Sequence, residues 1–142
     1  MVKNMTDLRL LFHRFLTNVR LCDTVEPVMM NRSRYMLIIA TRMRELNFNA
    51  LMDIYLEANL EDGAARYPKL SSAEQLLLAE QDFYQYLVQC FFTLDGAMYA
   101  IWEENGKYLS ALRLEPYQDG LLLSALETAP DYRRQGYACK LL

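Results

Sequence analysis

The residues Leu121-Leu122-Leu123-Ser124-Ala125-Leu126, followed shortly by Ala129-Pro130-Asp131-Tyr132-Arg133-Arg134-Gln135-Gly136-Tyr137-Ala138, decide the fold of this chain. The first stretch is an apolar strand pattern, the second is a tight basic turn that contains a glycine, and a helix pattern begins beyond it at Cys139–Leu142. A junction of this kind directs several backbone N–H groups, together with the positive end of a helix dipole, toward one place. The sequence therefore predicts a site for a phosphate or diphosphate after this strand.

Two further strand patterns precede this junction. Met98–Trp102 and Tyr108–Leu114 are separated by Asn105-Gly106, and the next strand, Leu121–Thr128, follows Asp119-Gly120. Asn-Gly and Asp-Gly supply the positive φ angles that two-residue hairpin turns require. The sequence thus predicts an antiparallel three-stranded meander that leads into the basic turn.

Helix patterns fill most of the chain before the meander. Asn49 is the expected N-cap of a helix from Ala50 to about Leu60, which ends near Gly63. Ser71-x-x-Glu74 has the spacing of a capping box, and the apolar stripe after it predicts a helix toward Phe91. Residues 35–46 fit either a helix or one face of a strand, and periodicity leaves both open.

The first residues form a separate pattern. Apolar side chains between Met5 and Leu21 have helical spacing, and the polar side of that helix is basic. Such a segment fits a helix packed on its own domain, which is the commoner case, or a membrane-surface or targeting segment. We expect an N-terminal helical extension over residues 1–34 and a second unit over residues 35–142.

Composition narrows the classes of function. The chain has 142 residues, of which 53% are hydrophobic and 23% charged, and this suits one domain with a real core. A net charge of −3 provides no global attraction for nucleic acid, and no apolar run reaches the length of a membrane span. Cys22, Cys90 and Cys139 show neither metal-ligand nor disulfide spacing. We therefore expect reduced thiols, no metal, no nucleic-acid or membrane partner, and a cytoplasmic location.

The basic turn also matches a known motif. Arg133-Arg134-Gln135-Gly136-Tyr137-Ala138 fits the pattern Q/R-x-x-G-x-G/A, and it lies behind the third meander strand with Pro130 and Tyr132 in its approach. In these features the chain resembles the GCN5-related N-acetyltransferases, the GNAT superfamily. Residues 121–142 match the family's motif in sequence, whereas residues 35–120 match only the order of its helices and strands. Residues 1–34 have no counterpart in the family. It implies an α+β, GNAT-like (acyl-CoA N-acyltransferase) fold that is C-terminally incomplete, with residues 35–142 as a partial GNAT domain.

The resemblance also implies a site for acetyl-CoA. Backbone amides from Arg134 to Ala138 would surround the diphosphate, and Gly136 would leave no Cβ in the way. The side chain of Arg133 or Arg134 would add charge-assisted hydrogen bonds. Backbone groups of the strand would pair with the pantetheine arm and offer an N–H to the thioester oxygen. The expected cofactor-binding residues are Leu126, Thr128, Arg133, Arg134, Gln135, Gly136, Tyr137 and Ala138.

Catalytic residues are not assigned by the sequence. The strand positions where similar enzymes place an acid or base are Leu122 and Ser124 here, and neither is a useful base. Glu127 is the carboxylate of this strand, but strict alternation turns it away from the face of Ser124 unless a bulge reverses the parity. Arg113 and Glu115 face either a substrate cleft or solvent.

Three functions remain open at this stage. The first is an enzyme that transfers an acetyl group from acetyl-CoA to a small-molecule or peptide amine by direct attack in a ternary complex. The second is a non-catalytic GNAT-like fragment that binds coenzyme A or a partner, and the third is a helix-rich interaction protein. The strand over residues 121–128 would have one unpaired edge, so we also expect self-association through it.

Overall fold

The computed structural model of this protein describes residues 34–142. The expected N-terminal helix and Cys22 lie outside the described residues, and nothing in the structure tests the division at residue 34. The elements in chain order are β1 (Tyr35–Ala40), η1 (Met43–Glu45), α2 (Phe48–Ile54), α3 (Leu56–Arg66), α4 (Ser72–Gln89), η2 (Phe91–Thr93), β2 (Met98–Glu104), β3 (Lys107–Tyr117), β4 (Gly120–Thr128), η3 (Pro130–Tyr132) and α5 (Tyr137–Leu141).

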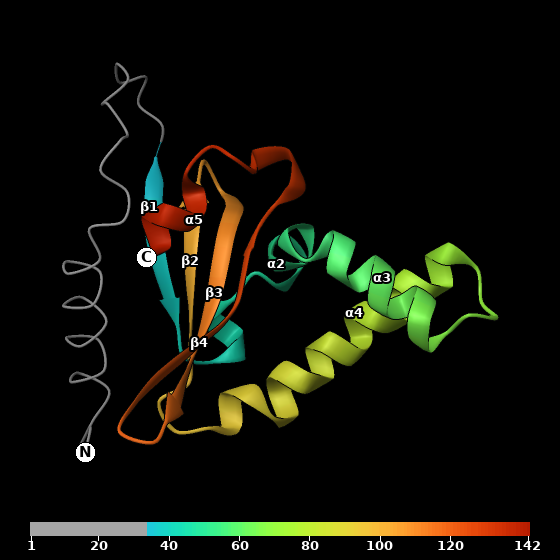
Figure 1. Ribbon diagram of the computed structural model, residues 1–142, viewed down its shortest axis with the longest axis horizontal. Coiled ribbons are helices and arrows are strands. Elements are labelled where there is room, and N and C mark those ends of the chain that lie inside the picture. The colour runs from blue at the N-terminus through green and yellow to red at the C-terminus, as the bar shows by residue number, and fades with distance from the viewer. Residues whose placement is uncertain (1–33) are drawn as a thin grey trace.

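The strands form one four-stranded antiparallel sheet in the order β1-β2-β3-β4 (Figure 1). The ambiguous segment 35–46 is a strand followed by a 3₁₀ turn, and β1 pairs with β2. The predicted meander is therefore confirmed and gains a fourth strand at one edge, while β4 lies at the other edge. The α+β class expected from the sequence is confirmed.

The sheet is covered on both faces. On one face, side chains such as Tyr99, Ile101 and Ala111 pack against α2 and α4 in the larger core. On the other face, Leu112 and Leu114 pack with Leu141 of α5. Figure 1 accordingly shows α2, α3 and α4 on one side of the sheet and α5 on the other. Alternation along each strand therefore decides whether a side chain meets the helical layer or α5.

Two residues that the sequence analysis placed at the ends of a helix, Asn49 and Gly63, do not lie at helix ends in the structure. The N-cap is Asn47, whose side chain accepts from the N–H of Ala50, and not Asn49. Gly63 does not end a helix but lies within α3, where a Cβ would come 2.4 Å from the carbonyl oxygen of Gln75. This glycine therefore permits close contact between α3 and α4.

The capping box of α4 is confirmed. The side chain of Ser71 accepts from the backbone N–H of Glu74, and the Glu74 carboxylate accepts from the backbone N–H of Ser71 at 2.9 Å. The Ser71 hydroxyl also donates to this carboxylate, at 2.7 Å. This bond lowers the pKa of Glu74 most, and the bond from the Ser71 backbone N–H lowers it further. The helix begins here because both partners are local in sequence.

The hairpin turns differ from one another. Asn105 and Gly106, with φ of 51° and 81°, connect β2 and β3 as expected. In the β3–β4 hairpin Tyr117 pairs with Gly120, and the positive φ of 51° falls on Gln118. The predicted Asp119-Gly120 turn is therefore shifted by one residue, and Gly120 is the first residue of β4.

The described part of the chain gives further limits. Among residues 34–142, no helix is both long and apolar enough to cross a membrane, and no group of His, Cys, Asp and Glu is arranged to hold a metal ion. Cys90 is a free, exposed thiol, whereas Cys139 is disulfide-bonded. The expectation of reduced thiols is thus correct at Cys90 and wrong at Cys139.

Candidate functional site

A bulge interrupts the edge strand β4. Arg113 of β3 pairs with Ser124, but Ala111 pairs with Glu127, so Ala125 and Leu126 together lie opposite a single residue of β3. Ala125 has a φ of 49°, in the left-handed region that costs a residue with a Cβ about 1 kcal/mol or more. Such a distortion persists only where its surroundings hold it in place.

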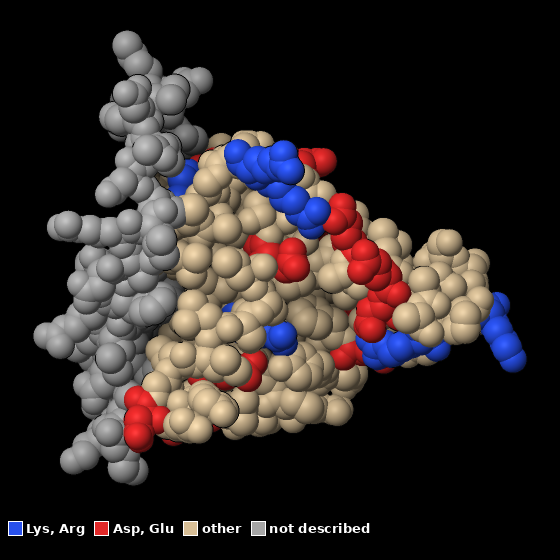
Figure 2. Space-filling view, in the orientation of Figure 1, with Lys and Arg blue, Asp and Glu red and all other residues tan. Residues whose placement is uncertain are grey.

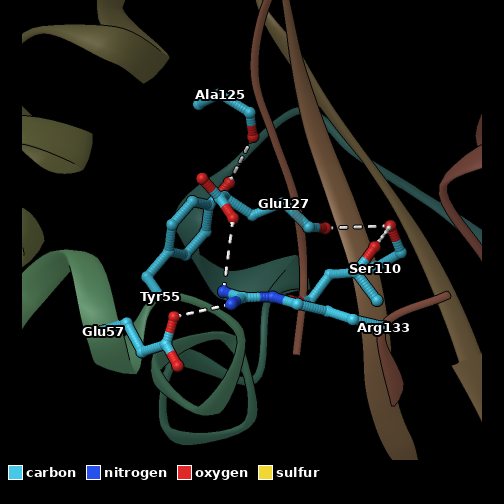
Figure 3. A network of polar contacts seen from close by, with 7 residues as sticks. Tyr55, Glu57, Ser110, Ala125, Glu127 and Arg133 are labelled. Carbon is cyan, nitrogen blue, oxygen red and sulfur yellow. Dashed lines mark hydrogen bonds and ion pairs between the residues drawn. The ribbon is translucent and has the colours of Figure 1, made fainter. Parts of the chain in front are cut away.

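A buried pair of tyrosines holds the bulge. The hydroxyl of Tyr55, at the junction of α2 and α3, donates to the carbonyl oxygen of Ala125 at 2.9 Å (Figure 3). The hydroxyl of Tyr99 donates to the Tyr55 oxygen at 3.1 Å. Burial raises the pKa of Tyr55 to about 12 and also raises the pKa of Tyr99. Both hydroxyls therefore stay protonated at neutral pH and serve as donors.

The bulge changes the face on which Glu127 lies. Residues opposite one another in an antiparallel pair share a face, and Ala111 and Arg113 lie on one face of β3. Glu127 therefore shares the helix-covered face with Ser124, although strict alternation would have turned it away. The bulge thus reverses the parity of β4, which is the condition that the sequence analysis set for Glu127 to share the face of Ser124.

Arg133 connects three parts of this site. Its guanidinium lies 2.6 Å from the carboxylate of Glu57 in α3 and 3.9 Å from that of Glu127, and its Nε donates to the carbonyl oxygen of Thr128 at 3.2 Å (Figure 3). Its backbone N–H donates to Pro130. We expected this side chain to add hydrogen bonds to a diphosphate, but it is directed to α3 and to the end of β4.

The turn after η3 presents its backbone differently. Arg134 and Gly136 have φ of 61° and 82°. Among the hydrogen bonds between described residues, none uses the backbone N–H of any residue from Arg134 to Ala138. Alternation of right- and left-handed backbone conformations gathers such N–H groups into a concavity that binds anions. This geometry is compatible with a negatively charged group in the turn, and the diphosphate site stays a prediction.

The remaining predicted residues divide into two groups. Thr128 ends β4 and lies within 3.0 Å of the Ser110 hydroxyl, and the exposed Leu126 lies in the bulge. Side chains of the turn are engaged elsewhere: the amide of Gln135 donates to the Asp131 carbonyl, and the hydroxyl of Tyr137 donates to Glu104. A ligand at this turn would therefore meet free backbone groups of the turn, because the side chains of Gln135 and Tyr137 are bound to other residues.

Opposite charges adjoin at this site. The space-filling view shows Lys and Arg side chains gathered over the loop between β4 and α5, with Asp and Glu side chains next to them over α3 (Figure 2). The salt bridge from Arg133 to Glu57 joins the two groups. An anionic ligand on the loop and a cationic ligand beside α3 would each meet a complementary surface.

Sequence reasoning missed Tyr55 as part of the site. The helix pattern expected from Ala50 to Leu60 runs through this position, whereas the structure ends α2 and begins α3 there. The pattern offered a weak signal, an aromatic residue with a polar tip among apolar positions. Its hydrogen-bond partner lies 70 residues away, so no local pattern could identify it.

The strained bulge gives a first prediction. Replacing Ala125 with Val should lower the free energy of unfolding by about 1–2 kcal/mol, because a β-branched residue tolerates positive φ poorly. Ala125→Gly is the matched control, since glycine adopts this backbone conformation at no steric cost, and its stability should stay within about 1 kcal/mol of the parent. Urea unfolding measures both. Equal losses for the two variants would show that the backbone at this position is not under strain.

This chain is similar to known proteins in structure and not detectably in sequence. No protein-family model matches the sequence, and no curated protein is significantly similar to it. Among solved structures, the PaiA N-acetyltransferase from Thermoplasma acidophilum in complex with coenzyme A is 13% identical, with 75% of this chain and 67% of that chain covered and a TM-score of 0.47. A GCN5-related N-acetyltransferase from Ralstonia eutropha JMP134 is 18% identical, with 76% and 71% covered and a TM-score of 0.41.

A third solved structure is the aminoglycoside N-acetyltransferase AAC(6')-Iy in complex with CoA, which is 14% identical, with 82% of this chain and 68% of that chain covered and a TM-score of 0.37. In this chain, helices precede a meander whose last strand is bulged and leads through an amide-rich turn into a helix, which is the order that the resemblance implied. All three TM-scores are below 0.5 and all three identities are below 20%, so the chemistry has to be argued from the site.

Proposed function

We propose that this protein is a GNAT-type acyltransferase that transfers an acetyl group from acetyl-CoA to an amine. Two neighbouring backbone features support the proposal. The edge strand β4 is bulged, and the turn that follows it has backbone N–H groups, from Arg134 to Ala138, without a hydrogen-bond partner among the described residues. A diphosphate fits such a turn, and the extended arm of coenzyme A fits an open strand edge.

The residues of the site suit the chemistry of direct attack. The thioester supplies an activated acyl carbon. The substrate ammonium gives up a proton to the carboxylate of Glu127, and the free amine nitrogen forms a bond to the acyl carbon. The C–S bond breaks, the sulfur leaves with its electron pair, and it takes up the proton that the nitrogen loses as the amide forms. Backbone N–H groups at the bulge would stabilise negative charge that develops on the acyl oxygen. Tyr55 would keep the bulge in the conformation that presents them, because it binds the Ala125 carbonyl.

Binding measurements test the first half of the proposal. Titration calorimetry of the full chain should show that CoA and dephospho-CoA, which share the diphosphate, bind at least about tenfold more tightly than pantetheine, which lacks it. No binding at millimolar CoA would exclude both the enzyme and the CoA-binding fragment, and it would leave the interaction protein.

Turnover separates the enzyme from a non-catalytic CoA-binding fragment. Release of free thiol from acetyl-CoA in the presence of a panel of amines is the expected result for an enzyme. Binding of CoA with no amine-dependent release of thiol would favour the fragment. A cytoplasmic location stays a prediction alongside this function.

The open edge of the sheet gives a further prediction about partners. We propose that copies of the chain associate through β4, whose backbone edge is unpaired in the sheet and whose Leu122, Leu123 and Leu126 are 45%, 36% and 40% exposed. Light scattering should show a mass that rises with protein concentration, and Leu123→Lys should lower it, because a charge on an edge strand opposes pairing. Leu77→Lys, on the exposed side of α4, is the control that should leave the mass unchanged.

CoA binding and self-association would both use the open edge of β4. A ligand that occupies β4 competes with a second copy of the strand, so saturating CoA should shift the protein toward monomer. A mass that is independent of concentration, or one that Leu77→Lys changes as much as Leu123→Lys, would contradict association through β4.

A further inference from the structure

A cavity lies between the α3–α4 pair and β3, on the helix-covered face of the sheet. Its volume is about 470 Å³, and its lining includes Asn59 of α3, Phe83 and Tyr86 of α4, and Arg113 of β3. Arg113 pairs with Ser124, so its side chain shares the face of Glu127. The cavity therefore adjoins the proposed reaction site on the side away from the turn that follows β4.

Arg113 is a cation held between aromatic rings. Its guanidinium carbon lies 5.0 Å from the centre of the Tyr86 ring and 5.7 Å from that of Phe91. Its Nε is fully buried and has no hydrogen-bond partner. Among the described residues, no carboxylate forms an ion pair with this side chain. The two rings lie against the guanidinium, and the buried Nε has no acceptor among the described residues.

The neighbouring carboxylates are engaged by another arginine. Asp62 and Asp82, which also line the cavity, both form salt bridges with Arg66, another lining residue. Of the two arginines that line the cavity, Arg66 is thus paired with two carboxylates, and Arg113 with none in the described part of the chain. Arg113 is half-buried, and the donor that has lost contact with solvent is its Nε. Buried donors are nearly always paired in folded proteins, so an unpaired Nε is costly. An arginine retained under these conditions points to a ligand that supplies the missing acceptor.

We propose that Arg113 binds a carboxylate of the acceptor substrate, so that the acceptor is a compound that carries both an amine and a carboxylate. This inference rests on the proposed function, because it assigns the amine to Glu127. A guanidinium matches a carboxylate through paired, charge-assisted hydrogen bonds. Arg113 and the partner of Glu127, Ala111, are two residues apart on β3, roughly 7 Å along the strand. A carboxylate and an amine separated by a few carbon atoms span that distance.

The electrostatics of Tyr55 agree with this placement. Burial is the main cause of its raised pKa, of about 12, while the charge of Arg113 lowers the value and the charge of Glu127 raises it. Both charged groups therefore act on the hydroxyl that holds the bulge. An ammonium beside Glu127 and a carboxylate beside Arg113 would each meet an opposite charge.

Matched probes test the proposal directly. Glycine, β-alanine, 4-aminobutanoate and 5-aminopentanoate form a ladder of amine-to-carboxylate distances, and each has an amide in which the carboxylate is replaced by a neutral group. Calorimetry of the full chain, with and without CoA, should show at least about tenfold tighter binding of one or more carboxylates than of the matching amides. Equal affinity for every acid and its amide overturns the proposal.

Two substitutions separate ligand binding from a structural role. Arg113→Met keeps an unbranched side chain between the rings and removes the unpaired donors, so the carboxylate preference should be lost while the melting temperature stays the same or rises. Lys107→Gln, which removes an exposed positive charge at the start of β3 and outside the cavity lining, is the control and should keep the preference. If Arg113→Met does not fold, Arg113→Lys serves in its place and should reduce the preference, because lysine cannot bind in the planar, paired manner.

The outcomes distinguish this inference from the proposed function. Carboxylate preference that depends on Arg113, in a chain that binds no CoA, would support the binding site and refute the acyltransferase. CoA binding and thiol release with amines, combined with no preference for carboxylates, would support the acyltransferase and overturn the role of Arg113. A large fall in melting temperature in Arg113→Met with an unchanged preference would assign Arg113 a structural role and also overturn it.

Discussion

Replacing Glu127 with Gln should lower kcat/KM for acyl transfer about 10²–10⁴-fold while leaving the affinity for CoA unchanged. The amide keeps the shape of the side chain and cannot accept a proton from the substrate ammonium, and general-base catalysis contributes a factor of this size. Glu127 is placed for this role by the bulge, which turns it to the face of Ser124. Initial rates of thiol release and CoA calorimetry measure the two quantities.

The pH profile separates a base from an ion-pair partner. Raising the pH increases the fraction of substrate amine that is already free, so the activity of Glu127→Gln should approach that of the parent as the pH nears the amine's own pKa. A side chain that acts only on structure gives no such recovery. The expected recovery follows the pKa of the substrate amine, not the pKa of the Glu127 carboxyl.

Glu57 provides the matched control. Its carboxylate binds the same guanidinium, that of Arg133, at 2.6 Å, compared with 3.9 Å for Glu127, and its side chain is 53% exposed. Exposed salt bridges contribute little to stability, so Glu57→Gln should change the free energy of unfolding by less than about 1 kcal/mol and leave kcat/KM near the parent value. Equal losses of activity in both variants would show that Glu127 acts only by holding Arg133.

Sequence signals that depend on neighbouring residues predicted the structure well. The capping box at Ser71 and Glu74 and the Asn105-Gly106 turn are complete within a few residues, and both form as expected. The turn around Gly136 belongs to the same class, because its left-handed glycine and following helix are local features. Local hydrogen bonds and backbone preferences are set by the nearby sequence, whatever the rest of the fold does.

The parts that sequence could not settle depend on distant contacts. The stretch Leu121–Thr128 contains no glycine or proline to mark a bulge, and the bulge is held by Tyr55 from another element. The face of Glu127 follows from that bulge and was therefore undecided. The sequence also left open whether Arg113 faces a cleft or solvent, because only the packing of α4 on β3 places Tyr86 against its guanidinium.

Replacing Gly136 with Val should weaken the binding of CoA by about 100-fold. Gly136 has a φ of 82°, which a β-branched residue does not adopt without strain, so the turn should rearrange and its N–H groups should lose their common direction. Hydrogen bonds to charged groups contribute about 1.5–3 kcal/mol each, and the loss of one or two of them accounts for the expected change. Calorimetry with CoA measures it.

Gly106 separates the effect on the turn from the general cost of backbone strain. It has nearly the same φ, 81°, and a Cβ there would meet nothing within 4 Å, but it lies in the β2–β3 hairpin and outside the proposed site. Gly106→Val should therefore lose stability, since positive φ is strained for valine wherever it occurs, and should keep the affinity for CoA. If both valine variants lost CoA binding equally, the loss would reflect destabilisation of the whole domain.

Pantetheine decides whether Gly136 acts through the diphosphate. This ligand lacks the diphosphate, so its affinity should be the same in the parent and in Gly136→Val, and the variant should bind CoA little better than pantetheine. Such a result would assign the binding energy to the N–H groups of Arg134–Ala138, which have no partner among the described residues. If Gly136→Val still preferred CoA to pantetheine as strongly as the parent does, the diphosphate would have to bind elsewhere, and the acyltransferase proposal would lose the observation that carries it.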